Sequence, residues 1–255
     1  MGGRWIGADR GQSPNRAGSV RDCQRTMPRA ARVVAVGAPH HLTQRGNNRQ
    51  DVFLVDDDRR AYLERLRQDC RARGGRVLDY CLMSNHVHLI AVPGRADSFA
   101  RALRRAHSSY AQAFNREYRR GGHLWQNRFF SCALAADHVP AALLYVDLNP
   151  VRAGLVGGDA GYPWSSAAWR ANGSEDALLD KEAWSEVRET GAWGEALRRG
   201  PGAWFEEELR EATRTGLPLG DERFVAELEQ RSGRRLRAAK PGPKPRAVGA
   251  GAGGK

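Results

Sequence analysis

Two histidines separated by a single residue stand inside an apolar run of the sequence. His86 and His88 belong to residues 80–92, YCLMSNHVHLIAV, whose length and aliphatic content are typical of a strand. Side chains two apart on a strand share a face, so we expect both imidazoles to project together while Val87 and Leu89 face a core. Two neutral imidazoles form half of a divalent-metal site. The alternative, ordinary core or surface histidines, is the commoner explanation of an isolated H-x-H pair.

The segments around this run predict the elements that would position the histidines. We expect a first strand over residues 32–45 interrupted at 37–39, a helix over about 59–73 capped by Asp56–Asp58, strands over 76–80 and 80–92, a helix over 98–119, a further strand-like block over 124–131, and a helix over about 138–148 capped by Asp137. This order is not the regular alternation of a doubly wound parallel sheet. It predicts an α+β fold, a ferredoxin-like antiparallel sheet with helices packed on it.

Basic side chains accompany two of these segments. The 98–119 helix places Phe99, Leu103, Ala106, Tyr110 and Phe114 at helical spacing and carries Arg101, Arg104 and Arg105 on another face. Residues 124–131, LWQNRFFS, interleave Trp125, Arg128 and Phe129, a combination that suits single-stranded nucleic acid because rings stack on bases and guanidinium groups pair with phosphates. We assign Arg45, at the end of the first strand, to the same DNA-binding set. A solvated helix face and a core-packed Trp125 are the alternatives.

Overall charge favours a polyanionic partner. The 255 residues hold 41 Lys and Arg against 29 Asp and Glu, a net charge of +12 with a pI near 10.3. Nucleic acid is the first partner that this suggests and an anionic membrane surface the second, unless the charge merely reflects basic tails. No apolar window reaches the roughly 20 residues of a membrane helix. The four cysteines are scattered without a C-x-x-C pair, so we expect free thiols in a cytoplasmic protein.

Composition also predicts the division of the chain. Residues 1–26 read as a disordered lead, with Met27 as the expected initiator, and residues 237–255 as a flexible basic tail. Between them we expect the main domain over 27–170 and a small helical region over 171–236, with Trp184, Trp193 and Trp204 as its core anchors. The break at 215–220 within that region is compatible with a DNA-binding helix-turn-helix or with a plain helical hairpin.

Four motifs in order carry a family resemblance. They are GAPHHLTQRGNNRQ, YCLMSNHVHLI, HLWQNRFFS and ALLYVDLNPVRAGLV. Together they resemble the REP-associated tyrosine transposases, which belong to the single-tyrosine HUH transposases. The resemblance covers about residues 27–169, with a weaker echo in ATRTGLPLGDERFVAELE near the C-terminus.

The resemblance implies a role for each residue that matches a motif. His86 and His88 correspond to the family's metal-binding pair, Tyr145 to its nucleophile, and Asn149 to the third metal ligand, for Mg²⁺ or Mn²⁺. Asn149 follows Tyr145 by four residues, so both project from one side of a helix, whereas Asp147 points elsewhere and is expected at the helix surface or in support of the site. A tyrosine hydroxyl has a pKa near 10 and needs an activated phosphate to react.

The activity that follows is metal-dependent cleavage and rejoining of single-stranded or hairpin DNA through a 5′-phosphotyrosine link, with no membrane partner and with a homodimer as the expected assembly. Two other functions stay open. The chain could be a non-catalytic nucleic-acid-binding regulator on the same scaffold, or a metal-dependent nuclease that uses water as the nucleophile.

Overall fold

The computed structural model describes residues 32–157, 161–172, 176–182 and 193–237. Its centre is a four-stranded antiparallel sheet in the order β2 (Gly75–Leu82), β3 (His86–Pro93), β1 (His40–Arg45) and β4 (Phe130–Ala133). Helix α1 (Asp56–Ala72) joins β1 to β2, and α2 (Ser98–Glu117) joins β3 to β4. This βαββαβ order with β1 beside β3 is the ferredoxin-like arrangement, so the predicted α+β fold class is confirmed.

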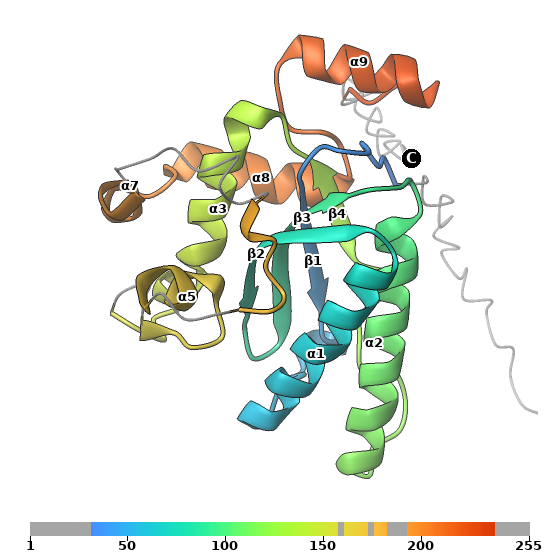
Figure 1. The fold of residues 1–255 in the computed structure, drawn as a ribbon, viewed down its shortest axis with the longest axis vertical. Helices are drawn as coiled ribbons and strands as arrows, with labels where there is room; N and C mark the ends of the chain where they lie inside the picture. Colours follow the sequence, from blue (N-terminus) through green and yellow to red (C-terminus); the bar gives the residue numbers. More distant parts are fainter. Residues whose placement is uncertain (1–31, 158–160, 173–175, 183–192, 238–255) are drawn as a thin grey trace, which may run out of the picture. The chain divides into compact units, whose positions relative to one another are not determined.

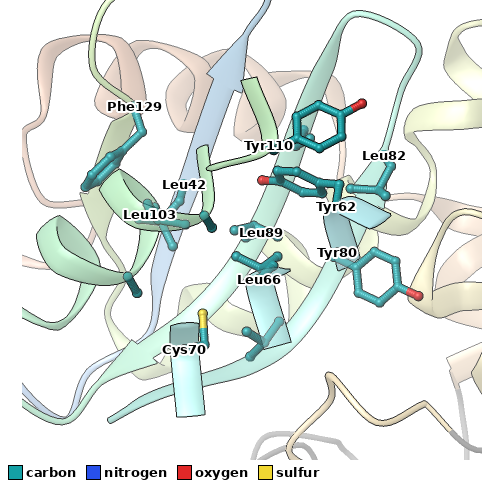
Figure 2. Close-up of a cluster of buried hydrophobic side chains, with 14 of the residues drawn as sticks. Leu42, Tyr62, Leu66, Cys70, Tyr80, Leu82, Leu89, Leu103, Tyr110 and Phe129 are labelled. Carbon is teal, nitrogen blue, oxygen red and sulfur yellow. The ribbon is translucent and has the colours of Figure 1, made fainter. Parts of the chain in front are cut away.

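Helices α1 and α2 cover one face of the sheet (Figure 1). Their apolar sides meet the sheet residues that alternate toward them, and Figure 2 shows the resulting core. It includes Leu42 of β1, Leu89 of β3, Tyr62 and Leu66 of α1, and Leu103 and Tyr110 of α2. The five apolar positions predicted for the α2 segment are all buried here, as expected from their helical spacing.

The opposite face is covered by α3 (Val139–Asp147) and α8 (Ala203–Thr215) (Figure 1). Ile90 and Val92, the next residues of β3 on the histidine face, pack there with Leu143 of α3 and Leu209 of α8. Because strand residues alternate, His86 and His88 point toward this second helical layer. The remaining described helices are α4 (Asn149–Arg152), α5 (Ser166–Asn172), α7 (Trp193–Arg199) and α9 (Glu222–Ser232), with short 3₁₀ turns at Asn47–Arg49 and Ala136–His138.

Three local predictions differ from the structure. Residues 32–39 are not a strand, since the chain turns at Gly37 with φ of +83°, and β1 begins at His40. Helix α1 has Val55 as its N-cap, while the Asp58 carboxylate accepts the backbone N–H groups of Leu54 and Val55. Asp137 lies inside a 3₁₀ turn rather than capping α3, since the turn adds three helical residues before Val139.

Among the three predicted tryptophan anchors, the structure describes the burial of Trp204 alone. Trp204 lies in the first turn of α8 and is 74% exposed, so its predicted anchoring role is wrong. Residues 183–192, which include Trp184, lie outside the described part of the chain, as do residues 1–31 and the basic tail from 238 onward. No helix within the described ranges is long and apolar enough to cross a membrane.

Candidate functional site

A hollow of about 380 Å³ lies between the sheet and the α3/α8 layer, and we call it the tyrosine pocket. It is lined by His41, Thr43, Arg45, Met83, His86, His88, Phe130, Tyr145, Asn149, Arg152, Ala153, Arg210, Thr213 and Arg214. The two histidines, the tyrosine and the asparagine named from the sequence therefore meet in one place. Ring centroids are 4.9 Å apart for His86 and His88 and 5.8 Å apart for His88 and Tyr145.

Sheet register explains why three strands contribute to this pocket. Arg45 lies opposite His86, and Thr43 lies opposite both His88 and Phe130. Directly opposed residues of an antiparallel pair share a face, so the alternate residues of β1, β3 and β4 project into the same space.

Each histidine of the pair uses one ring nitrogen within the protein. The Nδ1 atom of His86 lies 2.6 Å from Oδ1 of Asn85, and Nδ1 of His88 lies 3.0 Å from Nε2 of His41. These contacts leave Nε2 of each ring available, and a partner on the other nitrogen is what fixes a metal-binding imidazole. Burial, aided by Arg45, lowers the pKa of His86 to about 4; burial and the neighbouring His86 and His41 hold the pKa of His88 well below its ordinary value. Both rings are thus neutral at pH 7, the form that can coordinate a metal.

Tyr145 lies in a strongly basic environment. The Arg152 guanidinium carbon stands 4.2 Å from the centre of its ring, and that of Arg210 stands 5.6 Å away. Arg152 Nη2 also donates to the Tyr145 carbonyl at 2.6 Å and to Oδ1 of Asn149 at 2.9 Å. Glu206 pairs with Arg152 and Arg210 from outside the pocket, at 3.3 and 2.7 Å. Among the described lining residues four are arginines and none is acidic, which suits a phosphate group.

A metal ion would depend on an amide for its third protein ligand. No group of three His, Cys, Asp or Glu side chains is arranged for a metal among the described residues. Asn149 lines the pocket, and its Oδ1 already accepts a hydrogen bond from Arg152. An amide oxygen has two lone pairs, so it can accept that bond and still coordinate. Two imidazole nitrogens and one amide oxygen therefore fit a divalent ion.

The other predicted DNA-binding residues lie elsewhere. A hollow of about 670 Å³, which we call the α2 groove, runs between α2 and residues 122–129. The groove is lined by Arg104, Trp125, Arg128 and Phe129. Gln44 of β1 also lines it, and its side chain points away from those of Thr43 and Arg45 because strand residues alternate. The groove therefore opens on the sheet face opposite the tyrosine pocket. Trp125 donates from Nε1 to the His107 carbonyl at 3.1 Å, and Phe129 is 8% exposed beneath the guanidinium of Arg32. Both rings thus contribute to packing as well as lining the groove.

Arg101 and Arg105 line neither hollow. They are exposed on α2 and pair with Asp97 at 3.2 Å and Asp69 at 3.6 Å. His107, on the same helix, is buried, and its Nε2 lies 3.0 Å from the Tyr62 hydroxyl.

Of the two positions expected for Asp147, the structure rules out the helix surface. Its side chain is fully buried and forms an ion pair with Arg170 of α5, which also contacts Asp79 of β2 at 3.3 Å. Burial alone would lower the pKa of Arg170, but Asp147 and Asp79 outweigh it and raise that pKa. This buried triad joins the end of α3 to the sheet and so supports the segment that carries Tyr145.

Nine of the fourteen described pocket residues were missed by the sequence reasoning, and four of them are polar groups that build the site: His41, Arg152, Arg210 and Thr213. Arg152 carried a usable signal, because it follows Asn149 by three residues at helical spacing, and His41 precedes Arg45 by four residues on the same strand face. Arg210 and Thr213 carried none, since they reach the pocket from α8, beyond the boundary predicted at residue 170.

Comparison with known proteins finds one family model and solved structures that resemble this chain. The sequence model described as "Transposase IS200 like" matches residues 36–149, a span that contains His86, His88, Tyr145 and Asn149. A solved REP-associated tyrosine transposase bound to a REP hairpin is 20% identical over 65% of this chain and 96% of its own, with a TM-score of 0.49. A transposase structure from Deinococcus radiodurans R1 is 21% identical over 46% and 92%, with a TM-score of 0.33. No curated protein matches the sequence. Over residues 36–149, less than half of the 255-residue chain, the sequence is similar to the IS200-like transposase family.

Proposed function

We propose that this transposase cleaves and rejoins single-stranded DNA at hairpin-forming repeats, using Tyr145 as the nucleophile. The observation that carries the proposal is the meeting of Tyr145, Asn149, His86 and His88 in one arginine-lined pocket. The family match supports a transposase role. The motif resemblance to the REP-associated group supports hairpin DNA as the substrate and a homodimer as the assembly.

The reaction that fits these residues is a transfer of the phosphodiester to tyrosine. The Tyr145 oxygen attacks phosphorus, a phosphorus–oxygen bond to the phenol forms, and the bond to the 3′-oxygen of the preceding nucleotide breaks. The phenol proton passes to solvent, and the departing 3′-oxygen gains a proton to become a free hydroxyl. Because the covalent link retains the phosphodiester, the reverse reaction rejoins strands without an external energy source.

The arginines of the pocket would bind the scissile phosphate. Arg152 and Arg210 flank the Tyr145 ring, so their guanidinium groups are placed to pair with the non-bridging oxygens and to offset the charge that develops on them. His86, His88 and Asn149 would hold a divalent ion. The chemistry that such an ion supplies when bound is Lewis-acid polarisation of the phosphate.

The α2 groove would hold an unpaired part of the DNA. Arg104 and Arg128 line it beside Trp125, and no acidic side chain is among its described lining residues. Phe130 lines the tyrosine pocket and Phe129 the α2 groove, so the chain just before and at the start of β4 separates the two hollows. A single strand passing around this edge could occupy both.

A denaturing gel with end-labelled hairpin DNA distinguishes this function from its alternatives. We expect a protein-linked DNA band in the presence of Mn²⁺, its loss in Tyr145→Phe, and its retention in the control Tyr118→Phe, which removes the hydroxyl that donates to Asp58 far from the pocket. His86→Ala should lose cleavage but keep salt-sensitive DNA binding. Cleavage without the linked band would identify a nuclease that uses water, and binding without cleavage a regulator. A full yield of linked DNA from Tyr145→Phe would exclude Tyr145.

A further inference from the structure

We propose that Thr213 of α8 and His41 of β1 are positioning residues that fix the ring and the tautomer of His88, so that His88 presents the lone pair of Nε2 to the tyrosine pocket. The inference rests on the proposed function only in taking His88 as a metal ligand. It gives α8, from the C-terminal region, a direct part in building the site.

A chain of short contacts carries the proposal. Nδ1 of His88 lies 3.0 Å from Nε2 of His41, and Nδ1 of His41 lies 2.7 Å from the Thr213 hydroxyl. The same hydroxyl lies 3.2 Å from Sγ of Cys132. The His41 and His88 rings are stacked, with centroids 5.2 Å apart and planes 13° apart.

Burial makes each contact in this chain necessary. His41, His88, Thr213 and Cys132 are all at most 6% exposed, so water does not replace a lost partner. A buried donor or acceptor without a partner costs about 1–3 kcal/mol. Sheet register holds the group together, because His41 lies directly opposite Cys132 on β4 and diagonally across from His88 on β3, two residue pairs along the ladder on the same face.

Hydrogen-bond direction leaves two arrangements when both rings are neutral. In the first, His88 Nδ1–H donates to His41 Nε2, and His41 Nδ1–H donates to the Thr213 oxygen. In the second, every bond is reversed, and His88 carries its proton on Nε2. Only the first leaves the Nε2 lone pair of His88 free to bind a cation. It requires the Thr213 oxygen to accept from His41, which a hydroxyl can do while its own proton is directed to Sγ of Cys132.

The two histidines of the pair are thus held by different means. His86 is held by Asn85, its neighbour in sequence, whereas His88 is held through His41 by a residue 125 positions later on α8. Helix α8 packs against β4, β1 and α3 and adds Arg210 and Arg214 to the pocket. The tautomer of His88 that presents its Nε2 lone pair to the pocket therefore depends on the packing of α8 against the sheet.

Thr213→Val tests the proposal because it removes the hydroxyl and keeps the side-chain shape. We expect it to weaken Mn²⁺ affinity, measured by electron paramagnetic resonance titration of the full chain, by about 10–100-fold. Thr213→Ser should restore the affinity. Thr215→Val is the matched control on the same helix, since the Thr215 hydroxyl donates only to backbone carbonyls of Glu211 and Ala212; its Mn²⁺ affinity should equal that of the wild type.

A second readout needs no metal. In the metal-free protein, ¹⁵N NMR should detect scalar coupling between His88 Nδ1 and His41 Nε2 across their hydrogen bond, and with Mg²⁺ added the shared proton should reside on His88 Nδ1. Wild-type Mn²⁺ affinity in Thr213→Val, no recovery in Thr213→Ser, absence of the coupling, or a proton on His41 Nε2 in the Mg²⁺ form would each overturn the proposal. The nucleophile role of Tyr145 is read separately, from the covalent band, so its failure is distinguishable.

Discussion

Replacing Arg170 with Met should destabilise the protein strongly and in a pH-dependent manner. The substitution keeps most of the side-chain volume but leaves Asp79 and Asp147 without the cation that both contact. Both carboxylates are 0% exposed, so they cannot recover their hydration. Removing one partner of a buried ion pair typically costs about 3–5 kcal/mol.

The size of the loss can also be estimated from the protonation that would relieve it. An aspartate has a pKa near 3.9 in the unfolded chain, and pH 7 lies about three units above that pKa. Protonating the carboxylate at pH 7 therefore costs about 4 kcal/mol per carboxyl. At pH 5 the same proton costs about 1.5 kcal/mol. The variant then binds more protons folded than unfolded, so its unfolding free energy falls as pH rises, by about 1.4 kcal/mol per unit for each such carboxyl.

Urea unfolding at pH 5, 6 and 7, followed by tryptophan fluorescence and compared with wild type at each pH, measures this difference. Arg199→Met is the control, because Arg199 pairs with Glu195 at the surface and should contribute less than about 1 kcal/mol. Adding Asp79→Asn and Asp147→Asn to Arg170→Met should remove the pH dependence. An equal loss at pH 5 and pH 7 would refute the reasoning, because packing alone would then account for it.

Two further predictions concern the α2 groove and a buried histidine. Arg104→Ala should weaken binding of hairpin DNA with a single-stranded tail and reduce the slope of log K against log salt concentration by about one phosphate contact. Arg101→Ala, outside the groove, should do neither. Fluorescence anisotropy at several salt concentrations measures both variants, and equal behaviour would contradict the role of the groove in DNA binding. Burial lowers the pKa of His107 from 6.5 to about 3, so the unfolded state binds more protons in that window and stability falls as pH drops below 6.5. The difference in unfolding free energy between wild type and His107→Gln should therefore narrow by up to about 1.4 kcal/mol per pH unit as pH falls from 6.5 to 5. Urea unfolding at several pH values measures this difference, and a constant difference would count against a neutral His107.

Local pattern was enough for the parts of the site that lie within one element. Alternation along a strand places His86 and His88 on one face, and helical spacing brings Tyr145 and Asn149 to the same pocket although a break at Leu148 separates α3 from α4. The order of strands and helices was likewise enough for the ferredoxin-like sheet, because the hairpin from β2 to β3 and the helical crossovers leave few arrangements.

Only the tertiary structure decided which distant residues complete that site. The sequence treated Arg101, Arg104 and Arg105 alike, and the packing of α2 against its neighbours put Arg104 alone into a groove. It also left Asp147 either at the helix surface or in support of the site, whereas the ion pair with the buried Arg170 holds it inside. Thr213 and Arg210 have no local signal at all, because their role depends on which face of the sheet α8 covers. Periodicity reports the orientation of a side chain relative to its own element, and the partner that it meets is set by how elements pack.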